Sequence, residues 1–289
     1  MSSATAPATT TAPAPHVALP STIALGLART RIELIQFFRA RDAVIFIFAY
    51  PIIMLAIFST VFGQDGSEVG PDGGGLVPFA QYFLPGMIAT GIFLSSFQNL
   101  AIGIAEERDA GGLKRLRGTP LPSTAYFLGK IGSVLTTSVI QLALLLAVAV
   151  ALFDVSLPAD GGRWFTLAWV FVLGTASGVV CGIGFSSLPS SARAANAVVT
   201  PVVLVLQFIS GVFFTYDSLP GWMQDVAALF PLKWLAQGMR SVFLPDDFTV
   251  LEPAGSWQHG ATAAVLAVYL VAGLAVAVRT FRWRRRDDG

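Results

Sequence analysis

EERDAGGLKRLRGTPLP, residues 106–122, decides the fold, because it places seven charged side chains between two long uncharged runs. The flanking runs, 79–105 and 131–153, contain no Asp, Glu, Lys, Arg or His. Each is long enough to cross a bilayer, which needs about 20 helical residues. A segment this polar must lie in water, since the hydrocarbon core offers no partners for its charges. We call residues 106–122 the island.

The composition of the whole chain also indicates a membrane protein. Its 289 residues are 54% hydrophobic and only 12% charged, which is too few charges to cover a soluble globule of this size. Six uncharged runs are of membrane length: 44–62, 79–105, 131–153, 164–188, 197–216 and 260–278. The predicted fold class is therefore an all-α membrane protein with six transmembrane helices.

The positions of Lys and Arg predict the orientation. Fifteen of the eighteen lie before the first run, between the second and third, between the fourth and fifth, or after the sixth. The positive-inside bias then places the island and both termini in the cytoplasm of a multi-pass plasma membrane protein. The net charge of only +1 gives no reason to expect a nucleic-acid partner.

Four segments are predicted along the chain. Residues 1–20, rich in Ala, Pro and Thr, are expected to form a disordered tail. Residues 21–43 mix apolar residues with four Arg, and helical spacing favours an amphipathic helix in the headgroup layer over a plain cytoplasmic lead-in. Its apolar side would carry Leu27, Leu34, Ile35 and Phe38, with Arg29, Glu33 and Gln36 opposite. Residues 44–281 would form the six-helix domain, and 282–289 a basic cytoplasmic tail.

The region between the fifth and sixth runs has its own pattern. Two apolar stretches, 222–230 and 232–244, are separated by Pro231, and each is too short to cross a bilayer. Because proline interrupts a helix, we expect an external re-entrant helical hairpin between helices five and six.

The chain carries no motif for nucleotide or metal chemistry. Its one Gly-Lys pair, Gly129-Lys130, is followed by Ile131 rather than the Ser or Thr of a phosphate-binding loop. Two histidines and one cysteine are too few for a metal cluster. Transport coupled to protons would need ionisable side chains within the membrane, and the six runs have none. Transport coupled to sodium is disfavoured less strongly, because carbonyl and hydroxyl oxygens alone can bind sodium. We therefore expect a chain that is not an enzyme, holds no cofactor of its own and receives energy from a cytoplasmic partner.

Two blocks of residues resemble a known family. Both are similar to the membrane subunit of ABC-2 type ATP-binding-cassette exporters, which include daunorubicin-resistance-type permeases. The first block reads Glu107-Arg108-Asp109-Ala110-Gly111-Gly112-Leu113, then Leu116 and Thr119-Pro120-Leu121. Asp109 stands where the family usually has Glu, and Gly112 where Thr is common. The second comprises Ser210-Gly211-Val212-Phe213-Phe214, Leu219-Pro220 with Trp222, and Pro231 with Trp234. The resemblance covers about residues 24–286.

The resemblance implies a half-transporter of type V exporter-like fold. A second, identical membrane subunit and two copies of a separate ATPase, which would hold ATP and Mg, would complete an exporter of amphiphilic small molecules such as antibiotics. The island would be the ATPase-coupling element, with Leu113 and Leu116 on one face of a short helix. The candidate coupling residues are Glu106, Glu107, Arg108, Asp109, Gly111, Leu113, Arg115, Leu116, Thr119 and Pro120. Spans two and five would line the substrate path, with candidates Phe93, Phe97, Gln98, Asn99, Gln207, Phe208 and Phe213.

Several alternatives stay open. Within the same family, the cargo could be a polysaccharide or lipid-linked glycan, which would need a wider and more polar path. Outside it, the chain could be an ion-coupled secondary carrier, or a membrane anchor or sensor that recruits a partner through the island. A solvated island loop that only enforces topology would explain the bases of 106–122 but not its acids, glycines and prolines.

Overall fold

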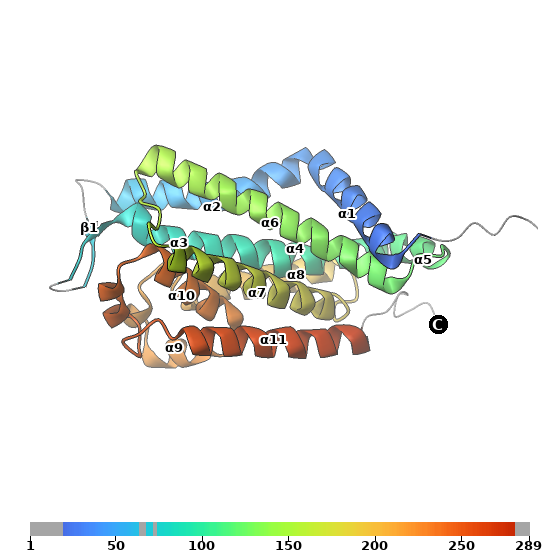
Figure 1. The fold of residues 1–289 in the computed structure, drawn as a ribbon. Coiled ribbons are helices and arrows are strands. Elements are labelled where there is room, and N and C mark those ends of the chain that lie inside the picture. The colour runs from blue at the N-terminus through green and yellow to red at the C-terminus, as the bar shows by residue number, and fades with distance from the viewer. Residues whose placement is uncertain (1–19, 64–67, 72–73, 281–289) are drawn as a thin grey trace, which may run out of the picture.

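The computed structural model describes residues 20–63, 68–71 and 74–280. Nearly all of the expected tail, 1–20, and the whole expected basic segment, 282–289, lie outside these residues. Within them, six helical segments are long and apolar enough to cross a membrane, as the sequence predicted. They run roughly along one axis in Figure 1. They are α2 (Arg41–Phe62), the continuous α3 (Phe79–Phe93), η2 (Leu94–Gln98) and α4 (Asn99–Asp109), α6 (Ser123–Phe153), α7 (Gly161–Phe185), α8 (Ala192–Ile209) and α11 (His259–Thr280).

The second and fourth spans form the centre of the bundle. Both are two-thirds buried by the rest of the chain, whereas at most a third of each other span is buried. α7 packs along α11 and against α10 (Pro231–Phe243) and η2. Glycines permit these close approaches, because a Cβ at Gly178 would collide with Ser96 and one at Gly182 would lie 2.9 Å from the Phe97 carbonyl oxygen. Small residues of this kind let membrane helices approach closely.

The second span contains a π-helical turn, η2, between α3 and α4. Its Ser95 hydroxyl donates to the Gly91 carbonyl at 2.7 Å and lies 2.9 Å from the Ser138 hydroxyl of α6. π-helical turns are rare in proteins, but those that occur often lie at functional sites. The turn therefore marks the middle of this span as a candidate functional region.

The fifth span differs from its predicted bounds, 197–216, at both ends. α8 begins earlier, where the Ser191 side chain accepts a hydrogen bond from the Ala194 amide as an N-cap. It ends earlier too, because Gly211 adopts a left-handed conformation with φ of 69°, which favours glycine and terminates a helix. The third span likewise begins sooner than predicted, since α6 starts directly after Pro122.

Helix α1 (Thr22–Arg39) packs along α6, as Figure 1 shows at the end of the bundle that also holds α5 (Gly112–Arg117). The contact is close, because a Cβ at Gly132 of α6 would lie 2.9 Å from Thr30 Cγ2. The charged side of α1 faces the protein, where Glu33 is buried. Its apolar side faces outward, with Ile23 69% and Leu27 66% exposed. We call this end of the bundle the island end.

The opposite end carries short elements. Helix α9 (Gly221–Ala228) and α10 occupy the two apolar stretches on either side of Pro231. Every residue of α10 is buried, against α3, α7 and α11. Two-residue strands, β1 (Glu68–Val69) and β2 (Val77–Pro78), pair antiparallel, and the turns η3 (Tyr216–Ser218) and η4 (Asp246–Leu251) complete this region. We call it the hairpin end.

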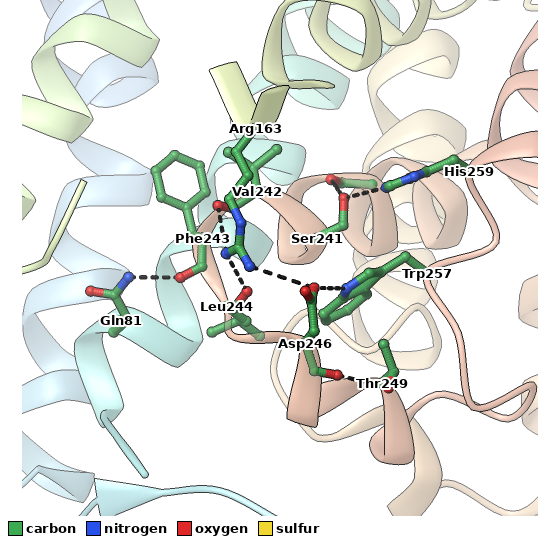
Figure 2. Close-up of polar contacts among 11 residues, drawn as sticks. Gln81, Arg163, Ser241, Val242, Phe243, Leu244, Asp246, Thr249, Trp257 and His259 are labelled. Carbon is green, nitrogen blue, oxygen red and sulfur yellow. Dashed lines mark hydrogen bonds and ion pairs between the residues drawn. The ribbon is translucent and has the colours of Figure 1, made fainter. Parts of the chain in front are cut away.

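Side chains from distant elements hold the last turn of α10, as Figure 2 shows. Arg163 of α7 donates to the Leu244 carbonyl at 2.6 Å, and Gln81 of α3 donates to the Phe243 carbonyl at 2.8 Å. The terminal carbonyls of a helix have no partner within it. These bonds satisfy them and fix the end of α10 to two membrane spans.

Candidate functional site

The island folds as a tight connection between the second and third spans. α4 ends at Asp109, and Gly111 turns the chain with a positive φ of 71°. The short helix α5 follows, and α6 then begins after Pro122. The glycine is required at the turn, because residues with a Cβ rarely adopt this conformation.

The apolar face of α5 points into the molecule rather than toward a partner. Leu113 is only 1% exposed and belongs to a buried cluster with Ile104 and Tyr126. Leu116 packs against the same cluster. The expectation that Leu113 presents a docking face is therefore corrected. Burying a leucine side chain contributes about 1.5–3 kcal/mol. Its apolar partners are Ile104, near the end of α4, and Tyr126, near the start of α6.

Glu107 also reaches inward, to α6. One carboxylate oxygen forms an ion pair with Lys130, and the other accepts a 2.8 Å hydrogen bond from the Tyr126 hydroxyl. Lys130 also pairs with Glu33 of α1 at 2.8 Å, and Glu33 pairs with Arg29. We call Arg29, Glu33, Glu107 and Lys130 the island cluster.

The island cluster is charge-balanced, with two cations and two anions from α1, α4 and α6. The side chains of Glu33 and Lys130 are each 9% exposed, and burying such charges is costly unless they are paired. Three of its four members were not among the sequence candidates. The one local signal was the four-residue spacing of Arg29 and Glu33 on a helix.

Arg108 and Asp109 bind the connection between α7 and α8. Arg108 donates to the Ser186 and Pro189 carbonyls at 2.8 and 2.7 Å. Asp109 accepts a 2.7 Å hydrogen bond from the backbone amide of Ala192, the first residue of α8. A carboxylate at a helix N-terminus is stabilising, because unpaired amides and the helix dipole favour negative charge there. Together with the contacts of Glu107 with α6, these bonds tie the end of α4 to α6, to α8 and to the α7–α8 connection.

A smaller set of island residues faces outward. Glu106, Lys114, Arg115, Thr119 and Pro120 are all exposed. The Arg115 guanidinium donates to the Ala110 carbonyl at 3.0 Å, and the Thr119 hydroxyl donates to the Leu116 carbonyl at 2.6 Å. We call these five residues the outer island face. Of the ten sequence candidates it contains four, and it adds Lys114.

Three of the substrate-path candidates meet in one cavity. A cavity of about 290 Å³ lies between α2, the second span and α8. Gln98, Asn99 and Gln207 line it together with Tyr50 and Thr200. The Tyr50 hydroxyl donates to Gln207 Oε1 at 2.9 Å. We call it the α2–α8 cavity. Its remaining wall is apolar: Phe46, Ile47, Leu94, Val203 and Leu204.

The aromatic candidates do not line this cavity. Phe93 and Phe97 stack on each other with ring centroids 5.1 Å apart and are 5% and 9% exposed. Phe213 packs at the hairpin end of the core, 5.6 Å from Phe58, whereas Phe208 is 45% exposed. The sequence signal that could have found Tyr50 is a polar residue beside a proline within a span.

Comparison with known proteins shows the family. A family model described as ABC-2 type transporter matches residues 27–244. Inner membrane transport permease YadH of Escherichia coli K12 is 24% identical over 227 residues, which cover 77% of this chain and 82% of that protein. Daunorubicin resistance ABC transporter permease protein DrrB1 of Streptomyces coeruleorubidus is 23% identical over 245 residues, covering 80% and 77%.

A third relative is the probable multidrug ABC transporter permease YbhR of Escherichia coli K12. It is 22% identical over 165 residues, which cover 57% of this chain and 44% of that protein. The family model spans well over half of the chain, and the six apolar helices agree with a multi-pass membrane protein. The chain therefore belongs to the ABC-2 type transporter family, as a membrane permease.

Proposed function

We propose that this chain is the membrane subunit of an ATP-driven exporter that moves amphiphilic small molecules, such as antibiotics, out of the cell. The observation that carries this proposal is the α2–α8 cavity, which combines a few amide and hydroxyl groups with an apolar wall. Such a lining suits a molecule that is mostly apolar with few polar groups. Relatives named for multidrug transport and daunorubicin resistance support this choice of cargo.

The energy would come from a separate ATPase subunit, bound in two copies to a pair of membrane subunits. We assign its docking to the outer island face, where Lys114 and Arg115 add positive charge around Thr119 and Pro120. The distribution of Lys and Arg supports a cytoplasmic island end and cytoplasmic termini.

The contacts of the island suggest how docking would reach the cargo. Asp109 is bonded to the first residue of α8, and α8 lines the α2–α8 cavity. Movement of the island would therefore be transmitted to the cavity wall through Asp109 and the Arg108 bonds to the α7–α8 connection.

The exposed face of α8 supports a second, identical subunit. Asn196 and Thr200 are exposed there and bond to each other at 2.8 Å. Polar groups that face lipid are costly, so this face is better suited to a second chain or to an aqueous path than to hydrocarbon.

Two elements complete the proposed membrane arrangement. Helix α1, within the expected segment 21–43, would lie in the inner headgroup layer with Leu27 and its apolar neighbours toward lipid, and its charged side on α6 rather than in water. α9 and α10 would form the external re-entrant hairpin. Residues 44–281 would be the six-helix domain, flanked by the tails 1–20 and 282–289.

Reconstitution tests the proposal. The chain would be purified with a candidate ATPase, placed in vesicles, and assayed for ATP-dependent movement of fluorescent daunorubicin. We expect Thr200→Val with Gln207→Leu to lower transport while ATPase binding stays unchanged, since both positions lie in the cavity wall and away from the island. Transport that follows a sodium gradient without ATPase would indicate a secondary carrier. ATPase binding without flux of daunorubicin or of a glycan lipid would indicate an anchor.

A further inference from the structure

A second cavity, of about 190 Å³, lies beneath α1, between α2, the second span and α6. We call it the α1–α6 cavity. Glu33 and Lys130 of the island cluster form part of its wall. Ile47 and Asn99 line both this cavity and the α2–α8 cavity. The two spaces are therefore neighbours that share a wall.

The polar part of the wall has hydrogen-bonding capacity to spare. Gln36, Asn99 and Ser133 line the cavity, and none of their side chains bonds to another residue within the described part of the chain. Each can both donate and accept a hydrogen bond. A hydroxyl group is the simplest ligand that satisfies such groups in both directions.

The apolar part of the wall is aromatic. Phe37 of α1 and Phe48 of α2 lie with ring centroids 5.8 Å apart and both line the cavity. The cavity reaches the surface at Gln36, which is exposed. An amphiphile could therefore keep its tail against these rings and toward lipid while its head lies inside.

The charges in the wall disfavour an ionic head. Lys130 is already paired with Glu33 and Glu107, and Glu33 with Arg29. A charged head would be desolvated without gaining an uncompensated partner. An uncharged head avoids that cost.

The volume limits the size of the head. The cavity measures about 190 Å³. That is smaller than the roughly 300–1,000 Å³ of sites that enclose a drug-sized ligand. The cavity therefore suits one small polar ring rather than a whole amphiphile.

We propose that the α1–α6 cavity binds the uncharged, hydroxyl-bearing head of an amphiphile, as a loading site beside the α2–α8 cavity. The loading role rests on the proposed export of amphiphiles. The binding itself requires neither ATPase nor transport, so the two ideas are tested separately.

Photo-crosslinking of the full chain in lipid nanodiscs, without ATPase, tests the site. Three probes share a nonyl tail with a diazirine next to the head and differ only in that head: β-glucoside, phosphocholine or sulfate. We expect the glucoside to label peptides of α1 and α6 about tenfold more than either charged head, and octyl glucoside to compete with it. Equal labelling by all three heads would overturn the proposed ligand class.

Matched variants locate the labelling. Ser133→Leu fills the cavity and Gln36→Leu removes an exposed amide, and each should lower α1 and α6 labelling about tenfold, equivalent to about 1.4 kcal/mol. Thr136→Val, an exposed position of α6 outside both cavities, should leave it unchanged. If Ser133→Leu does not fold, Gln36→Leu on the surface of α1 decides. Labelling that neither change lowers, or that spreads over lipid-facing α11, refutes the site, whereas site labelling without ATP-driven transport refutes only the export proposal.

Discussion

Buried ion pairs stand at both ends of the helix bundle, and they are built differently. At the hairpin end, Arg240 of α10 binds Glu252 at 2.6 Å and also donates to the Gly211 carbonyl at 3.0 Å. Their side chains are 6% and 3% exposed. We call Arg240 and Glu252 the hairpin pair. The island cluster instead joins three helices, and its Glu107 side chain is 26% exposed.

The difference indicates two roles. The hairpin pair joins residues only twelve positions apart and is closed to solvent, so it acts as a fixed brace for α10. In the island cluster, Lys130 has two acidic partners, Glu33 and Glu107, and a cavity lies beside it. A cation with two partners can lose one and keep the other, which suits the movement we propose for the island when an ATPase docks.

The largest expected effect is at the hairpin pair. Glu252→Ala leaves Arg240 buried without its carboxylate, and removal of one partner from a buried pair costs about 3–5 kcal/mol. The free energy of unfolding, measured in mixed micelles with increasing denaturing detergent, checks this. The double variant Arg240→Met with Glu252→Leu should recover most of the loss, because apolar groups replace both charges. If the free energy of unfolding of Glu252→Ala lay within about 1 kcal/mol of the parent value, water would reach the hairpin pair.

A smaller effect is expected at the island cluster. Glu33→Ala removes one anion, but Lys130 keeps Glu107, so we expect a loss of about 2 kcal/mol, below the range for a fully unpaired buried charge. The same unfolding assay measures it. Proteolysis should also cut α1 faster, since Glu33 joins α1 to α6. A loss as large as that of Glu252→Ala would contradict the proposed difference between the two ends.

The next prediction separates docking from stability. Lys114→Glu with Arg115→Glu reverses two charges on the outer island face, and we expect ATPase affinity to fall at least about tenfold, or 1.4 kcal/mol. Exposed changes of this kind usually alter stability by no more than about 0.5 kcal/mol. Titration of the purified ATPase onto the chain in nanodiscs measures the affinity.

Glu107→Lys is the informative contrast. It places a third cation beside Arg29 and Lys130, so both stability and ATPase affinity should fall. If the double change at Lys114 and Arg115 leaves affinity unaltered while Glu107→Lys lowers it without unfolding the chain, docking is not on the outer island face.

The parts of the fold that were predicted from sequence depend on local chemistry. Six spans follow from uncharged runs of membrane length, and the helices on either side of Pro231 follow from the missing amide of proline. The end of the fifth span was missed because Gly211 terminates α8 through its backbone conformation, which hydropathy does not report.

The orientation of the island side chains depends on contacts far away in sequence. Glu107 points inward because Lys130 and α1 stand there, and α1 packs closely because α6 has Gly129 and Gly132. The sequence located the charged block but not these partners. The α2–α8 cavity shows the same limit. The sequence singled out its polar residues on spans two and five, but it did not single out Tyr50, whose place in the wall depends on how α2 packs.

The smallest expected effect tests how dry the hairpin end is. Lys233 is 3% exposed and lies over the Trp234 ring at 3.9 Å. Burial lowers its pKa from 10.5 to about 8, although the charge of Glu252 opposes this. Between these two pH values the unfolded chain binds more protons than the folded chain, so stability rises with pH. The cost of the buried charge is fully present below about pH 8.

The comparison with Lys233→Met isolates this contribution from other groups that titrate. We expect the difference in unfolding free energy between parent and variant to change by about 1 kcal/mol from pH 7 to pH 9, with the parent gaining relative to the variant. A difference that stays constant would mean that Lys233 keeps an ordinary pKa and that water reaches α10. The hairpin pair, whose Arg240 also lies on α10, would then not be closed to solvent, and the fixed brace assigned to it would not exist.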